Sequence, residues 1–259
     1  MKKKTAFTIV STVFVTVFAA VCIAPFVYVI SNSFFTVQGF SVRGYYDVFL
    51  SDPRFLIRFW KSMLMCVVIA AGQLFTSILA GYGFSKCSFP GRSAMFYFLM
   101  LLMILPIQVT LVPNYIMLDK IHLLDTYHAL ILPSIFVPLG TFILRQSFNS
   151  IPDSIIDAAG LDGCGIPRTL ALIAVPMNKS GIVCVLLLSF LDGWNMVEQP
   201  ITYLKEYAQY PLSVALAYAP PTNSVIQLVC CLLAFLPPLF LFTYFNKELV
   251  EGITLAEVK

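Results

Sequence analysis

Acidic, small and turn-forming residues are gathered in one polar stretch, residues 151–176, which lies between two long apolar segments. Residues 150–153 (Ser-Ile-Pro-Asp) are typical of a helix start, with a capping serine, a proline in the first turn and an acid three residues after the serine. Asp162-Gly163 is a strong turn signal. Such residues can bind a partner noncovalently, and the stretch is long enough to form a binding surface for a soluble protein.

The spacing of the apolar residues in this stretch predicts two short helices, which we call its two limbs. Ile151, Ile155 and Ala158 or Ala159 recur at helical intervals, which predicts a narrow apolar face. The two alanines carry no bulk, so another surface can approach the backbone closely. We expect a second short helix over residues 168–175, ended by Pro176. The alternative interpretation is an amphipathic hairpin that lies on the lipid headgroups.

Residues that could do covalent chemistry are scarce. The chain has two histidines, His122 and His128, which we interpret as interfacial polar residues. It has no HExxH, no GxSxG and no phosphate-binding glycine-rich loop with lysine. We therefore expect no catalytic residue, no metal site and no ATP hydrolysis on this chain, so that any energy must come from a partner.

The composition indicates a membrane protein. The chain is 59% hydrophobic and 11% charged, with a mean hydropathy of +0.88, whereas soluble domains carry roughly 25% charged residues. A net charge of +3 is too small to suggest a nucleic-acid partner. We predict an all-α integral membrane fold with six transmembrane helices, over residues 7–30, 60–84, 94–117, 126–144, 181–199 and 225–245. The first is interpreted as a retained span, because its apolar run exceeds that of a secretory signal.

The basic residues predict the orientation. If the N-terminus is cytoplasmic, ten lysines and arginines lie on the cytoplasmic side and six on the other. The positive-inside rule then favours both termini in the cytoplasm. This orientation also places the polar stretch, residues 151–176, in the cytoplasm.

The order of residues in the stretch resembles a known family. Asp157-Ala158-Ala159, three residues, Gly163, nine residues and residues 173–176 (Ile-Ala-Val-Pro) are similar to the EAA loop of ABC importer permeases. The chain looks closest to the MalG-like carbohydrate-uptake branch of the binding-protein-dependent transport inner-membrane components. Residues 81–86 (GYGFSK) with 89–92 (FPGR), and Trp194-Asn195, also fit that branch.

Departures from the family pattern are few. Asp157 replaces the usual glutamate, which keeps the charge but shortens its reach. Ser180 stands where many members have a proline, and Leu170 replaces a common phenylalanine. None of these removes the architecture, but they leave the strength of partner docking open.

The resemblance implies a mechanical role in a cell-membrane importer. It implies one type I transmembrane domain over residues 1–259, with a core at 60–246 and a cytoplasmic coupling loop at 150–180, between the fourth and fifth helices. The implied partners are a second permease in a heterodimer, a cytoplasmic ATPase dimer that binds ATP and Mg, and an extracytoplasmic substrate-binding protein. The implied substrate is a sugar or oligosaccharide. The residues implied in ATPase coupling are Asp157, Ala158, Ala159, Leu161, Asp162, Gly163, Ile173 and Pro176.

Polar residues inside the spans mark a candidate substrate path. Gln108 and Asn114 lie near prolines of the third span, and Trp194 and Asn195 lie in the fifth. Polar groups in hydrocarbon face protein or water, although helix–helix hydrogen bonds explain them equally well. The alternative function is an ion-coupled secondary transporter, which usually needs intramembrane charge; Asp192 and Glu198 are the candidates.

Overall fold

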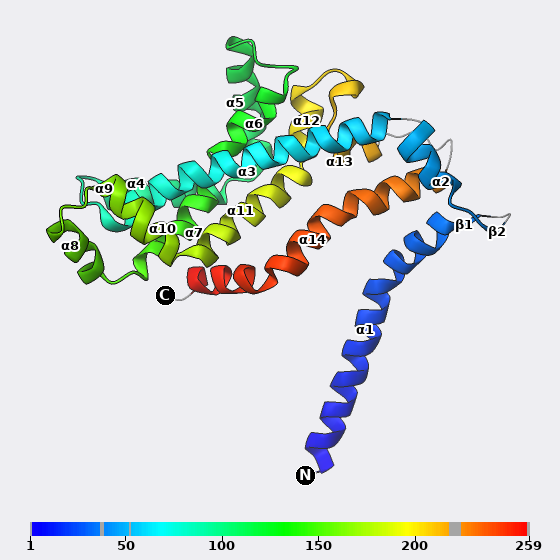
Figure 1. Cartoon of the computed structure of the whole chain (residues 1–259), viewed down its shortest axis with the longest axis horizontal. Helices are drawn as coiled ribbons and strands as arrows, with labels where there is room; N and C mark the ends of the chain where they lie inside the picture. The colour runs from blue at the N-terminus through cyan, green and yellow to red at the C-terminus, as the bar shows by residue number, and fades with distance from the viewer. Residues whose placement is uncertain (1, 37–38, 52, 218–223, 258–259) are drawn as a thin grey trace. The chain divides into compact units, whose positions relative to one another are not determined.

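The computed structural model describes residues 2–36, 39–51, 53–217 and 224–257, and these are almost entirely helical (Figure 1). The two short strands pair antiparallel, with Phe35 opposite Phe40. In chain order the elements are α1 (Lys2–Phe34), β1 (Phe35–Thr36), β2 (Gly39–Phe40), α2 (Arg43–Tyr46), the π-helical η1 (Asp47–Ser51), α3 (Arg54–Lys86), α4 (Arg92–Ile104), α5 (Ile107–Lys120), α6 (Tyr127–Ile135), α7 (Pro138–Asn149), α8 (Asp153–Leu161), α9 (Ile166–Thr169), the π-helical η2 (Leu170–Ala174), α10 (Val175–Met177), α11 (Lys179–Trp194), α12 (Glu198–Tyr203), the 3-10 turn η3 (Tyr207–Gln209), α13 (Leu212–Ala217) and α14 (Ser224–Glu257).

The all-α membrane class is confirmed. Within the described residues, four segments are long and apolar enough to cross a membrane: Ser11–Phe34, Arg54–Lys86, Tyr127–Asn149 and Val225–Gly252. Two bent helix pairs, α4 with α5 and Ile166–Met177 with α11, raise the number to six if each pair is one span. The predicted six helices are therefore the upper count, and that number stays a prediction.

The predicted third span, residues 94–117, is divided into two helices at 104° to each other. Leu105 and Pro106 both have extended backbone, with ψ of 124° and 145°. A residue before proline is pushed out of the helical region by contact with the proline ring, so α4 ends at Ile104. Pro113 lies inside α5. The chain therefore turns sharply at Pro106, whereas α5 continues through Pro113.

The predicted fifth span ends earlier than residue 199. Helix α11 stops at Trp194, and α12 begins at Glu198. In a continuous helix the backbone N–H of residue 200 would donate to the Met196 carbonyl. Pro200, in the first turn of α12, has no N–H and cannot make this hydrogen bond. The carbonyl of Met196 instead accepts a 2.6 Å hydrogen bond from the Ser213 hydroxyl. The chain break is therefore stabilised by α13 rather than by helix continuation.

The chain groups into two compact units, and the first comprises residues 1–57 and 218–236. Within its described part, the Ser33 hydroxyl lies 2.8 Å from the Tyr45 hydroxyl, and the Phe26 and Phe235 ring centroids are 4.9 Å apart. The span Ser11–Phe34 has none of its most apolar window buried. The span Ser11–Phe34 of α1 therefore leaves most of its apolar side chains exposed within this unit.

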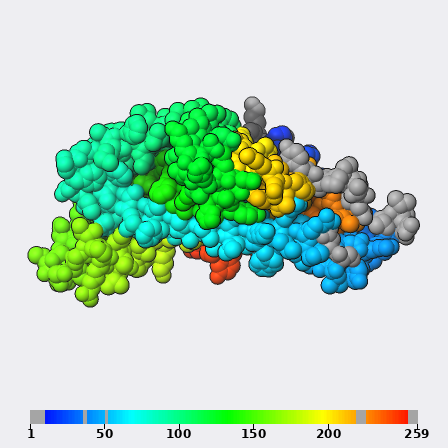
Figure 2. All heavy atoms as spheres, turned by 90° about the horizontal axis from the view of Figure 1, so that it is seen from above, coloured from blue at the N-terminus to red at the C-terminus, as the bar shows by residue number. Residues whose placement is uncertain are grey.

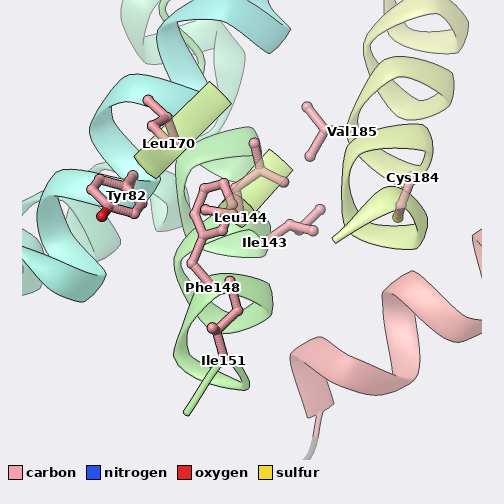
Figure 3. Packing of buried hydrophobic residues seen from close by; sticks show 9 residues of the cluster. Tyr82, Ile143, Leu144, Phe148, Ile151, Leu170, Cys184 and Val185 are labelled. Carbon is pink, nitrogen blue, oxygen red and sulfur yellow. The ribbon is translucent and has the colours of Figure 1, made fainter. Parts of the chain in front are cut away.

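The second unit comprises residues 58–217 and 237–259 and holds the main core. Its buried cluster joins α3, α7, η2 and α11 (Figure 3), and the Tyr82 and Phe148 rings pack edge to face with their centroids 5.8 Å apart. Within this unit, the segment α8–α10 lies at the C-terminal end of α3 and α12 lies toward its other end (Figure 1). The core members are Tyr82, Ile143, Leu144, Phe148, Ile151, Leu170, Ala174, Cys184 and Val185.

Candidate functional site

The loop between α7 and α11 contains the predicted first helix. Helix α8 begins after Pro152, with Asp153 in its first turn. The predicted serine cap is wrong, because the Ser150 hydroxyl donates 2.7 Å back to the Ser147 carbonyl of α7. Pro152 occupies the cap position with extended backbone, and its fixed φ suits that place. The helix start was thus predicted at the right place, with a different residue at the cap.

The C-terminus of α8 is closed by Gly163. Its φ is +78°, the left-handed region that favours glycine. The Gly163 N–H donates 3.1 Å to the Gly160 carbonyl, and the Cys164 N–H donates 2.9 Å to the Ala159 carbonyl. This pair of bonds is a Schellman motif, which satisfies the last carbonyls of a helix and turns the chain. Gly163 therefore fixes the angle at which the second limb leaves α8.

The two faces of α8 differ in exposure. Asp157, Ala158 and Asp162 are exposed, and Leu161 is 90% exposed. Ala159 is 5% exposed, so the expectation that both alanines offer themselves to a partner is wrong for Ala159. In Figure 2 the residues of α8 and α9 form a protrusion at one end of their unit. The face available to a partner is thus Asp157, Ala158, Leu161 and Asp162.

The second limb does not end at Pro176, as the sequence predicted. Helical backbone continues through α9, η2 and α10 to Met177, and the break falls at Asn178. The π-helical stretch η2 lies just before Pro176 and has a wider helical turn than an α-helix. This wider turn accommodates Pro176, which has no backbone N–H to donate. Ile173 is half-buried and Pro176 is exposed.

Asn178 is a buried pivot between this limb and α11, which meet at 86°. Its Oδ1 accepts a 2.7 Å hydrogen bond from the Ser147 hydroxyl, and its Nδ2 donates 3.0 Å to the Ala174 carbonyl. A buried amide costs stability unless it is hydrogen-bonded, and both bonds are made here. The pivot therefore ties the loop to α7.

A second attachment joins the loop to α3. The ammonium of Lys86 donates 2.6 Å to the Ile151 carbonyl and 2.6 Å to the Asp153 carboxylate. The Lys86 side chain is 7% exposed, whereas that of Asp153 is 82% exposed. We call this arrangement the Lys86 latch. The sequence analysis quoted Lys86 only within a motif and did not predict the contact.

The Lys86 latch depends on the charge of Asp153. The hydrogen bond from Lys86, with its electrostatic attraction, lowers the pKa of the Asp153 carboxyl below its ordinary 3.8. Because the pKa is lower in the folded chain, the pairing stabilises the loop above pH 3.8 and is lost as the pH falls through the lowered value. At neutral pH the Asp153 carboxyl is therefore ionised.

Replacing Lys86 by methionine is expected to loosen α8. The variant loses both hydrogen bonds. A hydrogen bond from a charged donor lowers the equilibrium constant for local opening of a segment by a factor of about ten. Amide hydrogen exchange over residues 153–161 should quicken by about that factor. Asp153→Asn should have a smaller effect, because the Ile151 contact remains. Lys179→Met, at an exposed position, is the control; equal exchange in all three would contradict the latch.

The candidate path residues are dispersed by the structure. Asn195 lines a cavity of about 520 Å³ in the second unit, and Gln108 donates 2.8 Å to Glu198 on its wall. Asn114 lies at the Tyr203 hydroxyl. Trp194 is buried among aromatic rings, 5.7 Å from both Phe59 and Phe190. Trp194 is therefore a packing residue of the core, not a wall of the cavity.

Several cavity residues were missed or left open by the sequence analysis. Gln73, Ser134 and Ser189 line the wall and were not singled out, and Asp192 and Glu198 were named only as candidates for the ion-coupled alternative. A glutamine in the middle of an apolar span is the signal that could have found Gln73. Among the described residues no three His, Cys, Asp or Glu side chains are grouped to hold a metal ion.

Known proteins match nearly the whole chain. YtcP of Bacillus subtilis (strain 168), a polygalacturonan/rhamnogalacturonan transport system permease protein, is 27% identical and covers 95% of this chain and 96% of its own. The arabinooligosaccharides transport system permease protein AraQ of the same organism is 29% identical, covering 85% and 79%. The sn-glycerol-3-phosphate transport system permease protein UgpE of Yersinia pestis is 27% identical, covering 76% and 72%.

A solved structure shares the fold. The crystal structure of a bacterial ABC transporter involved in the import of the acidic polysaccharide alginate contains a chain that superposes with a TM-score of 0.86. The match covers 95% of this chain and 98% of that one at 19% identity. The shared fold and the long apolar helices define a multi-pass membrane protein.

A family profile gives the particular assignment. The profile described as binding-protein-dependent transport system inner membrane component matches residues 73–251. The chain belongs to this family, and it is a permease component of an ABC import system.

Proposed function

We propose that this chain is the permease of an ATP-driven importer of a sugar or oligosaccharide. The observation that carries the proposal is the near-complete match to YtcP, whose name gives polygalacturonan and rhamnogalacturonan as its substrates. AraQ, named for arabinooligosaccharides, adds a second carbohydrate relative. The cavity with amide and hydroxyl side chains is compatible with a polyhydroxylated substrate.

The proposed partners follow from the loop. We place α8 against a cytoplasmic ATPase, with Asp157 and Asp162 meeting basic groups and Leu161 filling an apolar pocket. Leu161, at the C-terminal end of α8, is 90% exposed, and this supports the docking because burying an exposed apolar side chain in a partner is favourable. Gly163 and the second limb, with Ile173 and Pro176, would carry motion of α8 into α11.

The remaining assignments complete the proposed importer. ATP and Mg are bound by the ATPase dimer and no cofactor by this chain. A second permease forms a heterodimer with it, and an extracytoplasmic binding protein delivers substrate. Both termini are placed in the cytoplasm, so that residues 150–180 face the ATPase.

Leu161→Ala is expected to weaken ATPase docking. Burial of a leucine side chain is worth about 1.5–3 kcal/mol, so its loss should lower ATPase recovery with the tagged chain by at least about tenfold. Leu101→Ala is the matched control, because Leu101 is also exposed, at 61%, but lies on α4. Recovery that is equal in the two variants would remove Leu161 from the proposed interface.

The proposal as a whole is tested by affinity purification. The tagged chain is isolated from its own host in mild detergent, and the proteins that accompany it are identified by mass spectrometry. We expect a second permease and an ATPase, and the accompanying binding protein then gives the sugar by direct ligand analysis. Recovery of a chain that is stable, alone and without an ATPase would overturn the proposal.

The alternative function, an ion-coupled secondary transporter, is not proposed, because the chain belongs to the binding-protein-dependent transport family. The two carboxylates that suggested it, Asp192 and Glu198, lie on the cavity wall.

A further inference from the structure

The cavity that contains Asn195 lies wholly within the second unit. Its wall comes from α3, the start of α5, the end of α6, the end of α11 and the first residues of α12. Its volume, about 520 Å³, is within the roughly 300–1,000 Å³ of small-molecule sites. The polar wall residues are Gln73, Ser134, Ser189, Asp192, Asn195, Glu198 and Gln199.

One wall residue has hydrogen-bonding groups without a protein partner. Gln73 is 4% exposed, and among the described residues its side-chain amide makes no hydrogen bond. Among the described residues the buried side-chain atoms without a partner are Ser77 Oγ and Glu198 Oε2, so the Gln73 amide is not sealed off and borders the space of the cavity. Because Gln73 lines the cavity, a bound molecule with hydroxyl groups could satisfy both its carbonyl oxygen and its N–H groups. This observation indicates a ligand site.

The wall is acidic. Asp192 and Glu198 are its ionisable residues, and no lysine, arginine or histidine of the described chain lines it. One oxygen of Glu198 accepts a hydrogen bond from Gln108, and the other is buried without a partner. The Asn195 amide donates to the Leu191 carbonyl, which leaves its oxygen available as an acceptor. The cavity therefore offers mainly acceptors, and it repels anions.

We propose that this cavity takes an uncharged carbohydrate and excludes uronates, the sugars whose C6 carbon is a carboxylate. Sugar hydroxyls donate to the carboxylates and to the amide oxygens, including that of Gln73 in the middle of α3. A uronate brings a further carboxylate beside those of Asp192 and Glu198, and no cation of the wall balances it. The inference rests on the proposed sugar transport. It separates this chain from the alginate importer that shares its fold, whose substrate is an acidic polysaccharide, and also from YtcP, whose name gives polygalacturonan, a polymer of a uronate.

The charge of the cavity is tested with thiol reagents. Asn195→Cys is introduced into the full chain, purified with its partners in lipid nanodiscs, and labelled with a cationic trimethylammonium or an anionic sulfonate methanethiosulfonate. Modification of that cysteine is followed by peptide mass spectrometry, which distinguishes it from the native cysteines. We expect the cationic reagent to react at least about tenfold faster. Adding Asp192→Asn and Glu198→Gln should bring the ratio close to one.

The ligand class is tested with two disaccharides that differ only at C6, digalactose and digalacturonate. Digalactose should slow labelling of the cysteine, and digalacturonate should not. Equal protection by both sugars, equal rates with both reagents, or no labelling by either reagent would each overturn the inference. Gln199→Cys provides a second reporter if Asn195→Cys does not assemble. If neither sugar protects but the importer still takes up oligosaccharide, this inference fails and the proposed function stands.

Discussion

Gly163→Val is expected to uncouple ATP hydrolysis from uptake while the protein remains in the membrane. Gly163 has a φ of +78°, and a Cβ at this position would meet nothing within 4 Å. The effect is therefore conformational and not steric. A β-branched residue held in the left-handed region costs about 1–2 kcal/mol, which favours a backbone that breaks the Schellman motif and changes the exit angle of the second limb.

The size of this effect is measured in proteoliposomes that contain the complete importer. Substrate uptake per ATP hydrolysed should fall on the order of tenfold in Gly163→Val. Gly163→Asn is the matched control, because asparagine adopts positive φ far more readily than valine, and it should retain most of the coupling. Gly160→Ala tests the neighbouring glycine, which also lies in open space but is helical. If Gly163→Val transports as well as Gly163→Asn, the backbone angle is not part of coupling.

Gly81→Ala is expected to destabilise the second unit. A Cβ on Gly81 would lie 2.9 Å from the Leu144 Cβ and 3.1 Å from the Arg145 backbone nitrogen. These atoms belong to α7 and cannot rotate away, so the two helices must separate. Overpacking of this kind costs about 1–3 kcal/mol. Because Leu144 is part of the core that supports the loop, the change should also loosen the loop.

Gly83→Ala is the control on the same helix. Its Cβ would meet nothing within 4 Å, so the substitution should be neutral or stabilise α3 by up to about 1 kcal/mol. The free energy of unfolding is measured for both variants in mixed micelles titrated with a denaturing detergent. Equal values for Gly81→Ala and Gly83→Ala would show that the close approach of α3 to α7 does not limit stability.

Local properties of the sequence determined the membrane class and the positions of most elements. Apolar runs longer than about 20 residues have few alternatives to spanning helices. Asp162-Gly163 marked the turn because a positive φ is nearly a glycine property, and the structure has it at +78°. The start of α8 was also predicted at residues 150–153, although Pro152 rather than Ser150 occupies the cap. Each of these features depends on residues that are neighbours in the chain.

Long-range contacts decided what local patterns could not. Helical spacing treated Ala158 and Ala159 alike, and only the packing of α8 on its unit buries Ala159. The Lys86 latch joins residues 67 apart in sequence, and the Ser147–Asn178 bond joins residues 31 apart. The cavity gathers Gln73, Asp192 and Glu198 from three helices. Hydrophobic periodicity specifies which face of a helix is buried but not against which helix, so these juxtapositions exist only once the helices have packed.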